Sequence, residues 1–308
     1  MSSRINKKLL TIGIPTFERG VRVKQTIIQA RSAIESVKDR VEILVIDDNS
    51  SDDTWNLIGN ECDGSVRCIR NSKRMGFKGN IRQIFLNSES KFTMLMWDDE
   101  SVIKEGIAEL VNLIHQNDDV GIFSTKYLSD GRVIRGSKQL EPIKLNMVRH
   151  HTNHAPGLIF NTEQSLNAIS KLGIFYEHAD NWYPQVVIAY CILFNESKGL
   201  SLPILVCEEK SPMQSGLGDY SGVNGRWREW MFFKDFYEHL RSNNSSMAGR
   251  LIDLHNNNML YFIFKGILAE NSTYAKIFLY SILRNFIWIV FRIVVGHIRS
   301  WFEYLRKR

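Results

Sequence analysis

The chain has 308 residues, of which 44% are hydrophobic and 23% charged. This length and apolar content suffice for one large domain or two closely packed ones, and they exclude a disordered chain as the default. The net charge of +6 arises at the C-terminal end, because residues 276–308 contain seven Lys or Arg and one acid. The first 275 residues keep 32 of the 39 basic and 32 of the 33 acidic side chains. The neutral body therefore gives no indication of nucleic-acid binding.

The four cysteines, Cys62, Cys68, Cys191 and Cys207, form no C-x-x-C pair and no even framework. We therefore expect neither a zinc site nor a disulfide scaffold, and a reducing compartment fits this pattern best. Residues 1–15 contain only a short apolar run, which is too short for a signal-peptide core. The N-terminal half is therefore expected in the cytoplasm.

Between residues 9 and 124, short β-branched apolar runs alternate with amphipathic stretches of helical length, a pattern that predicts βαβ units and a mostly parallel sheet. The expected strands cover residues 9–14, 41–46, 67–70, 92–97 and 120–124. Further on, the pattern predicts strands at 157–160 and 200–207 and helices at 161–171 and 184–194.

These patterns predict an α/β fold, with a mostly parallel sheet flanked by helices and a C-terminal helical extension. Residues 1–210 would form the main domain and residues 226–273 a helical region. Residues 211–225 are rich in Gly and Ser and predict a mobile loop. Residues 274–308 would form a separate basic helix.

Three adjacent carboxylates, Asp98, Asp99 and Glu100, follow the apolar strand at 92–97. Like charges at a strand end repel one another unless a cation lies among them, and Mg²⁺ or Mn²⁺ with phosphate oxygens would remove that repulsion. The alternative is that Asp99 or Glu100 only caps the helix that begins near residue 103.

A second acidic stretch, residues 47–53, follows the strand at 41–46. Turn and cap preferences explain Asp52 and Asp53. Asp47 and Asp48 directly end a buried strand, where a carboxylate needs a ligand or a hydrogen bond, and a pyrimidine N–H would suit this position.

The sequence lacks the glycine motifs of dinucleotide-binding domains and P-loops, so phosphate must be neutralised in another way. The available groups are a metal ion and the basic residues Lys73, Arg74, Lys78 and Arg82. These basic residues also fit a solvated surface.

Four motifs in order, at residues 14–19, 46–50, 71–80 and 96–100, resemble the family 2 glycosyltransferases of GT-A fold. The resemblance covers residues 8 to about 125 well and 150–207 loosely. It implies an inverting glycosyltransferase that takes its sugar from a nucleotide diphosphate, with a UDP-sugar favoured as donor.

The resemblance also implies roles for single residues. Thr16, Phe17 and Glu18 would line the base and ribose pocket, Asp48 would bind the base and Asp98 the ribose. Asp99 would hold the metal ion, and Glu100 stands at the next position of the metal motif. Apart from the resemblance, Arg82 of the basic group is a candidate donor-binding residue.

The catalytic base is expected in residues 176–182, where the candidates are Glu177, His178 and Asp180. The resemblance favours Asp180, because family members carry the base just before a helix such as the one at 184–194. Asp180 also fits a simple cap or turn residue. Residues 153–157 resemble the acceptor-side turn of the family.

Residues 274–301 are apolar but interrupted by Arg284, Arg292 and Arg299, so no uncharged run is long enough to span a bilayer. At helical periodicity the arginines share one narrow stripe opposite an apolar face, which predicts a helix lying on an anionic membrane surface. A core helix or a dimer seam would give the same pattern.

We therefore expect a peripheral enzyme on the inner face of the cell membrane that transfers a sugar to a lipid-linked glycan during polysaccharide biosynthesis. Its partners would be the donor, the acceptor and anionic lipid, and not nucleic acid. The alternatives are a nucleotidyltransferase, a non-catalytic nucleotide-sugar-binding protein and a membrane-tethered DNA-binding protein. The last alternative leaves the clustered carboxylates unexplained, because they would repel phosphate.

Overall fold

The computed structural model describes residues 8–129, 131–209, 223–240 and 248–253, and within 223–227 only the backbone. The chain divides into two compact units between Gly216 and Leu217. In the second unit the structure describes helix α9 (Val223–Leu240) and the short helical stretch at 248–253. Every sequence-predicted site residue belongs to the first unit.

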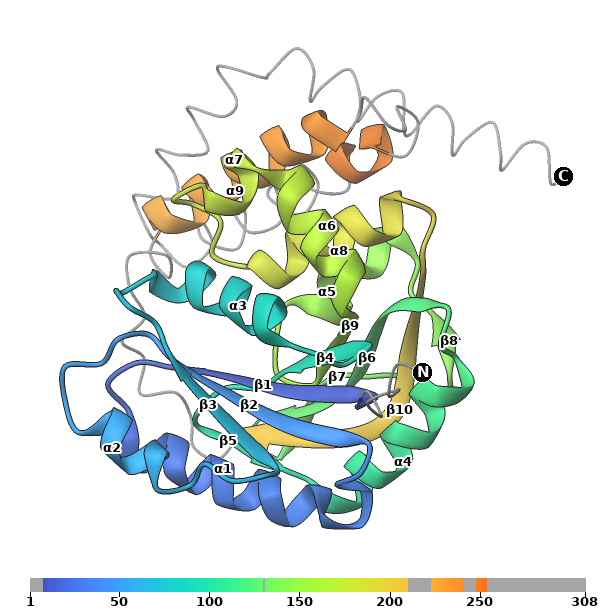
Figure 1. Ribbon diagram of the computed structural model, residues 1–308. Coiled ribbons are helices and arrows are strands. Elements are labelled where there is room, and N and C mark those ends of the chain that lie inside the picture. The colour runs from blue at the N-terminus through green and yellow to red at the C-terminus, as the bar shows by residue number, and fades with distance from the viewer. Residues whose placement is uncertain (1–7, 130, 210–222, 241–247, 254–308) are drawn as a thin grey trace, which may run out of the picture. The chain divides into compact units, whose positions relative to one another are not determined.

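A single ten-stranded sheet forms the centre of the first unit (Figure 1). Eight strands run in the order β3-β2-β1-β4-β9-β6-β10-β5, while β7 pairs with β6 and β8 pairs with β10. The strand bounds are β1 Leu10–Thr16, β2 Val41–Asp47, β3 Val66–Arg70, β4 Phe92–Leu95, β5 Glu100–Val102, β6 Val120–Ser129, β7 Arg132–Arg135, β8 Glu141–Pro142, β9 Leu158–Asn161 and β10 Lys198–Glu209.

The first four strands are mutually parallel, because β1 pairs in parallel with both β2 and β4, and β2 pairs in parallel with β3. Strand β9 then lies antiparallel between β4 and β6. The carboxyl ends of β1, β2 and β4 therefore lie at the same edge of the sheet.

Helices cover both faces of this sheet. In Figure 1, α1, α2 and α4 lie on one face, and α3, α5, α6 and α8 lie on the other. Their bounds are α1 Gly20–Ile34, α2 Thr54–Gly59, α3 Gly76–Asn87, α4 Lys104–Gln116, α5 Val148–Thr152, α6 Thr162–Leu172, α7 Ile174–Glu177 and α8 Pro184–Phe194. Short 3₁₀ turns lie at Glu35–Val37 and Leu145–Met147.

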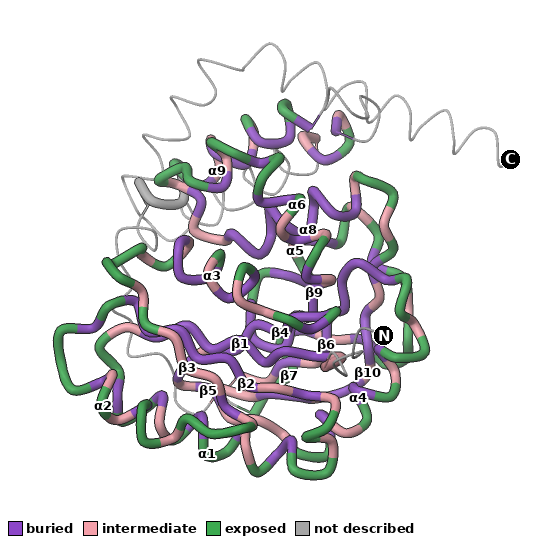
Figure 2. Tube along the Cα trace, in the orientation of Figure 1, coloured by how far each residue is buried: buried purple, intermediate pink, exposed green. Residues whose placement is uncertain are grey.

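The core forms because the apolar faces of the helices pack on strands that are buried on both sides. In α1, Val23, Ile27 and Ala30 are fully buried at three- and four-residue spacing. Figure 2 shows the central strands buried and the outer helix surfaces exposed. Gly106 allows α4 to approach β10 closely, since an added Cβ would lie 1.8 Å from the carbonyl oxygen of Leu205.

The main expected strands and helices are confirmed, although their ends differ by a few residues. The strand expected at 92–97 ends at Leu95, and the sequence pattern missed β5, β7 and β8. Of the expected loop at 211–225, residues 223–225 begin α9 and the others lie outside the described residues. The basic stretch at 274–308 also lies outside them.

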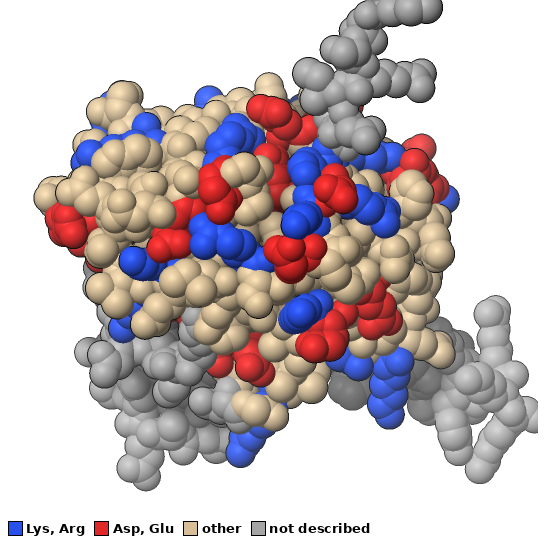
Figure 3. Space-filling view, turned by 60° about the horizontal axis from the view of Figure 1, so that its bottom comes forward, with Lys and Arg blue, Asp and Glu red and all other residues tan. Residues whose placement is uncertain are grey.

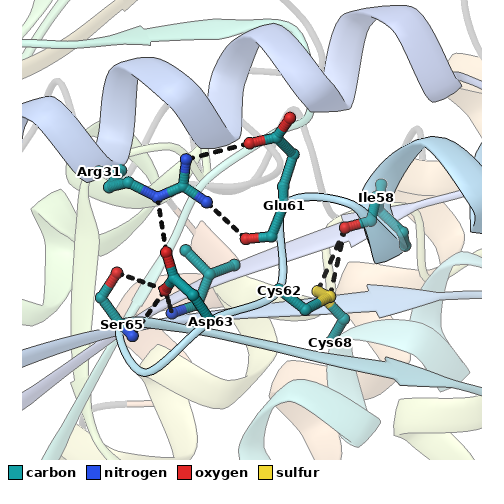
Figure 4. The surroundings of a disulfide bond; sticks show 8 residues. Arg31, Ile58, Glu61, Cys62, Asp63, Ser65 and Cys68 are labelled. Atoms are coloured by element: carbon teal, nitrogen blue, oxygen red, sulfur yellow. Dashed lines mark hydrogen bonds and ion pairs between the residues drawn. A yellow bond between two sulfur atoms is a disulfide. The ribbon is translucent and has the colours of Figure 1, made fainter.

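Cys62 and Cys68 form a disulfide bond, so the expectation of no disulfide is wrong for this pair. A spacing of six residues does not reveal the bond, because it depends on the turn between α2 and β3 that brings the two Cα atoms to 5.9 Å. Figure 4 shows Arg31 of α1 reaching Glu61 and Asp63 beside this turn. Cys191 and Cys207 are free and buried.

The surface of the described part agrees with a neutral body. Figure 3 shows Lys and Arg side chains interspersed with Asp and Glu over the face displayed. Among the described residues, no helix is long and apolar enough to cross a membrane.

Candidate active site

The candidate site is built around Thr16, the last residue of β1. Its hydroxyl donates a hydrogen bond of 2.8 Å to Oδ2 of Asp98, which follows β4. Its carbonyl oxygen accepts a hydrogen bond of 2.9 Å from the backbone N–H of Asp48, which follows β2. The acids that follow β2 and β4 therefore lie together at one edge of the sheet.

Arg19 lies between the two aspartates of the 98–100 motif. Its Nη1 atom is 3.0 Å from Oδ1 of Asp98 and 3.0 Å from Oδ2 of Asp99. Arg22 is more distant, with its Nη1 3.8 Å from Oδ2 of Asp99. The Asp98 side chain is 7% exposed and the Asp99 side chain 28%. One guanidinium thus contacts an inner and an outer carboxylate together, and its single positive charge offsets one of the two negative charges.

The charge balance at this pair follows from burial. Burial raises the pKa of Asp98, and the opposing effects of the Arg19 charge and the Thr16 hydrogen bond leave it above its ordinary value. Burial lowers the pKa of Arg19, but the charges of Asp98 and Asp99 outweigh that effect and raise it. Arg19 therefore stays protonated and is the group that keeps two adjacent carboxylates together.

The backbone that carries Arg19 is held in an uncommon conformation. Glu18 has φ 52°, in the left-handed region that non-glycine residues seldom adopt. The second acidic loop fixes it, because the Glu18 N–H donates to Oγ of Ser50 over 2.9 Å and Ser51 Oγ donates to Oε1 of Glu18 over 2.7 Å. This turn directs Arg19 toward the Asp98–Asp99 pair.

Asp47 and Asp48 are buried, as expected, and protein groups satisfy both. Asp47 accepts a hydrogen bond from the Ser50 backbone N–H and pairs with Nε of Arg70 at 3.2 Å. Asp48 accepts from three donors: Asn71 Nδ2 at 2.9 Å and the backbone N–H groups of residues 75 and 76 at 2.7 and 2.8 Å. Asp48 therefore ties the start of α3 to the end of β2.

Glu100 faces a different environment from its two acidic neighbours. Its residue is 4% exposed, and its Oε1 accepts a hydrogen bond of 2.7 Å from the hydroxyl of Tyr127. Burial raises the pKa of Glu100 to about 8, against the lowering effect of the Tyr127 hydrogen bond. One oxygen of this carboxyl group is therefore already held by Tyr127.

The chemistry of the residues that follow β4 is compatible with a divalent ion. The described residues contain no group of three or more His, Cys, Asp and Glu side chains that could hold a metal ion. Asp98 and Asp99 nevertheless offer adjacent carboxylates, and Arg19 marks a position between them where a cation is stable. Mg²⁺ typically takes one or two carboxylates and completes its shell with substrate phosphates and water.

Asp180 lies in the turn between α7 and α8, where its backbone N–H donates to Nδ1 of His178 over 3.1 Å. Lys78 of α3 holds this turn, because its Nζ donates to the carbonyl oxygen of Glu177 at 3.1 Å and also to that of His178. Arg82, expected to bind the donor, has its Nη1 3.1 Å from Oε1 of Glu177. Two of the four basic residues thus contact the segment that carries the candidate base.

Aromatic side chains lie around the same edge of the sheet. The guanidinium of Arg74 stands 4.0 Å from the ring centre of Phe17, within the range of a cation–π contact. Phe77 of α3 and Trp97 lie with ring centres 5.3 Å apart, and Phe77 is 51% exposed. Flat apolar surfaces of this kind suit a base or a sugar ring.

Sequence reasoning missed several residues of the site. Arg19 was part of the motif at 14–19 without a role, because no sequence pattern connects it with two aspartates that lie 79 and 80 residues further along the chain. Asn80 of α3 donates through Nδ2 to the carbonyl oxygens of Thr16 and Ile46, at 3.3 and 3.1 Å. Tyr127 approaches Glu100 from the distant strand β6, and no sequence pattern reveals that contact.

A sheet with parallel strands in its first half, helices on both faces and carboxylates at the carboxyl ends of β1, β2 and β4 defines a GT-A type of α/β enzyme. The model for the family "Glycosyl transferase family 2" matches residues 11–171. The chain belongs to this family.

One curated relative is the Escherichia coli enzyme "UDP-Glc:alpha-D-GlcNAc-diphosphoundecaprenol beta-1,3-glucosyltransferase WfaP". The two sequences are 24% identical over 105 residues, which is 34% of this chain and 42% of the relative. The match thus spans less than half of the relative's length.

Two solved structures share the fold at low sequence identity. The TarS 1–349 fragment from S. aureus, in complex with UDP-GlcNAc, has a TM-score of 0.58 and 13% identity, and the match covers 80% of this chain and 72% of that one. The mannosyltransferase PcManGT from Pyrobaculum calidifontis, in complex with GDP-Man and Mn²⁺, has a TM-score of 0.54 and 13% identity. That match covers 91% of this chain and 81% of the other.

Proposed function

We propose that this glycosyltransferase moves a sugar, with inversion, from a uridine diphosphate sugar to a lipid-linked glycan. The observation that carries the donor part is the hydrogen-bonded series Asp48–Thr16–Asp98–Arg19–Asp99 at one edge of the sheet. It combines acceptors for ribose hydroxyls, a carboxylate for a metal ion and a cation for phosphate. The family membership disfavours a nucleotidyltransferase and a non-catalytic protein.

The proposed donor site divides its tasks among these residues. Asp98 binds the ribose, and Thr16, Phe17 and Glu18 line the pocket of the base and ribose. Asp48 acts at the base, where its carboxylate is already oriented by Asn71 and by the start of α3. Arg82 adds positive charge on the other side, although its present partner is Glu177. The names of the relative and of the TarS complex, which refer to UDP-Glc and UDP-GlcNAc, favour uridine.

We assign the metal site to Asp99, with Mn²⁺ or Mg²⁺ as the ion. The bound ion would offset the negative charge of the diphosphate as that group leaves. Glu100 is a secondary candidate for the metal site in this proposal, because one oxygen of its carboxyl group already accepts a hydrogen bond from Tyr127.

The proposed base is Asp180, with Glu177 as the alternative. Asp180 accepts the proton of the acceptor hydroxyl while that oxygen forms its bond to the anomeric carbon. The bond from this carbon to the diphosphate oxygen breaks, and the nucleoside diphosphate leaves with the electron pair. Lys78 holds the backbone of residues 177 and 178 and so positions the base.

A lipid-linked acceptor would bring the enzyme to the cytoplasmic face of the cell membrane. This assignment is supported by the acceptor in the E. coli relative's name, a diphosphoundecaprenol. It also agrees with the basic, periodic sequence of residues 274–308, which would bind an anionic membrane surface. We propose no nucleic-acid partner for the neutral body.

Thermal unfolding with UDP, in the presence and absence of Mn²⁺, tests the donor site, because a ligand that binds the native state raises its stability. We expect Asp99→Asn to lose the Mn²⁺-dependent part of the shift. Asp53→Asn is the matched control, because Asp53 is an exposed acid at the start of α2 whose partner is Asn56. Absence of any UDP shift in the unmodified protein would refute the donor assignment.

The catalytic assignment is tested by UDP release from UDP-Glc with α-D-GlcNAc-diphosphoundecaprenol as the trial acceptor. A general base acts only on the acceptor proton, so Asp180→Asn should keep the UDP shift while turnover falls about 10²–10⁴-fold. Glu177→Gln, tested in parallel, decides between the two candidates. Equal loss of UDP binding in Asp99→Asn and Asp180→Asn would contradict this division of roles.

A further inference from the structure

The most informative contact outside the assigned roles is the one that Arg19 makes with both aspartates of the donor motif. A single nitrogen, Nη1, lies 3.0 Å from an oxygen of Asp98 and 3.0 Å from an oxygen of Asp99. These are the distances of charge-assisted hydrogen bonds. The guanidinium therefore occupies the position between the two carboxylates at which a divalent ion would gain most from both.

This arrangement makes the two cations competitors. A metal ion that binds Asp99 must displace Arg19 from that carboxylate, since a dication and a guanidinium cannot share the same position without strong repulsion. The Arg19 side chain is 46% exposed, so it has room to move toward solvent. The turn at Glu18, which Ser50 and Ser51 hold, fixes only the backbone.

We infer that Arg19 is an internal counter-cation that keeps free metal ions off the Asp98–Asp99 pair until a nucleoside diphosphate arrives. The diphosphate gives the displaced guanidinium a new anionic partner, and planar guanidinium groups bind phosphate oxygens well. Metal and nucleotide then bind cooperatively, because each lowers the cost of moving Arg19. This inference rests on the proposed donor site and adds an order of binding to it.

The neighbouring cation does not replace Arg19 in this role. Arg22 contacts only Asp99, at 3.8 Å, and its side chain is 58% exposed. Lys24, on the same helix, pairs instead with Glu61 at 3.5 Å. The series Arg19, Arg22 and Lys24 therefore gives three positive side chains near the start of α1 that differ in their contact with the aspartate pair.

The experiment measures Mn²⁺ binding alone, by the loss of the free-ion electron paramagnetic resonance signal, and then UDP binding at saturating Mn²⁺ by calorimetry. We expect Arg19→Gln to bind Mn²⁺ alone about tenfold more tightly than the unmodified protein, a change of about 1.4 kcal/mol. The same variant should bind UDP more weakly at saturating Mn²⁺, because its diphosphate loses a cation. Lys24→Gln removes an equal charge and should change neither affinity.

Two further variants control for misfolding of Arg19→Gln and for replacement of Arg19 by Arg22. Arg19→Lys keeps the charge but not the planar group, so its Mn²⁺ affinity should lie between those of the unmodified protein and Arg19→Gln. The double variant Arg19→Gln/Arg22→Gln removes the nearest substitute cation and should bind Mn²⁺ at least as tightly as Arg19→Gln.

The inference is overturned if neither Arg19→Gln nor the double variant binds Mn²⁺ more tightly than the unmodified protein. It is also overturned if Lys24→Gln gives the same gain, since the effect would then be one of net charge. Failure of the donor site itself has a different signature, because the unmodified protein would not bind UDP even with Mn²⁺ present.

Discussion

Buried polar side chains of this protein gain their partners from distant parts of the chain. Arg135 is 1% exposed and donates to the carbonyl oxygens of Thr125 at 2.9 Å, of Pro156 at 2.6 Å and of His154. Burial lowers the pKa of Arg135 to about 10, so it remains charged at neutral pH. Its hydrogen bonds fix the turn before β9, which resembles the acceptor-side turn of the family.

His151 is a second buried titratable residue, and unlike Arg135 it is uncharged in the native state at neutral pH. It is 5% exposed, and its Nδ1 has no hydrogen-bond partner. Burial, with the nearby charges of His150 and Arg135, lowers the pKa of His151 to about 4. The native state therefore holds this imidazole neutral, while the unfolded chain takes up a proton near pH 6.5.

We predict that His151 destabilises the fold as the pH falls. Between the folded and unfolded pKa values of His151, the unfolded state binds more protons than the native state. The free energy of unfolding is therefore highest above pH 6.5 and falls as the pH is lowered toward 4. Between pH 7 and pH 5 the free energy of unfolding of His151→Gln should therefore fall by about 2 kcal/mol less than that of the unmodified protein. Urea unfolding at both pH values measures this difference.

His115→Gln is the control, because His115 is an exposed histidine on α4, away from His151. If His151→Gln and His115→Gln alter the pH dependence equally, burial of His151 is not its cause.

At the residue scale, the sequence predicted which side chains stand at the strand ends but not their partners. Thr16, Asp48 and Asp98 follow apolar runs, and that pattern is enough to bring them to one edge of the sheet. The bridging position of Arg19 and the contact of Tyr127 with Glu100 depend on rotamers and on strand order. Neither of these leaves a periodic signal.

At the element scale, hydrophobic periodicity predicted the long helices and the buried strands, and it failed for short elements. Strand β5 begins with Glu100 and has only three residues, so no alternation is visible in it. It exists because β10 pairs with it in antiparallel register, with Glu209 opposite Glu100. The insertion of β9 between β4 and β6 likewise depends on tertiary packing, because local hydrophobic periodicity carries no information on strand order.

The turn between α2 and β3 yields a prediction about the disulfide that the sequence pattern missed. The bond between Cys62 and Cys68 closes a loop of about seven residues, for which the loss of unfolded-state entropy is worth about 2 kcal/mol. Reduction should lower the free energy of unfolding by about that amount and leave UDP binding unchanged, since the turn lies at the amino ends of the strands.

Urea unfolding with and without reductant measures this effect, and Cys62→Ser/Cys68→Ser is the control that reductant should not affect. Titration of thiols in denaturant should find only Cys191 and Cys207 reactive before reduction. Four reactive thiols in the untreated protein, one for each cysteine of the chain, would contradict the bond.

At the scale of the whole molecule, charge separates a neutral body from a basic end. Residues 1–216 form one compact unit, and the face seen in Figure 3 mixes both signs of charge. The net charge of +6 is carried by residues 276–308, which lie outside the described part. The residues of the proposed donor site all belong to the described body, so we expect the basic segment to have another partner.

We predict that deletion of residues 274–308 releases the enzyme from membranes while the body stays folded and still binds UDP with Mn²⁺. An arginine stripe opposite an apolar face suits the boundary of anionic headgroups better than a protein core. Anionic lipid should strengthen membrane binding by about 1 kcal/mol for each arginine near the surface. Added salt should weaken only this electrostatic part.

Liposome flotation of the full-length and truncated proteins, on neutral and on anionic vesicles, provides the measurement. A tail that binds by charge and apolar contact together gives strong flotation on anionic vesicles and weaker flotation on neutral ones, and the truncated protein should float on neither. The UDP shift with Mn²⁺ must be retained in the truncated protein, because that result shows an intact body. If truncation instead causes aggregation or unfolding, the segment packs in the core or joins two copies of the chain, and the membrane assignment is wrong.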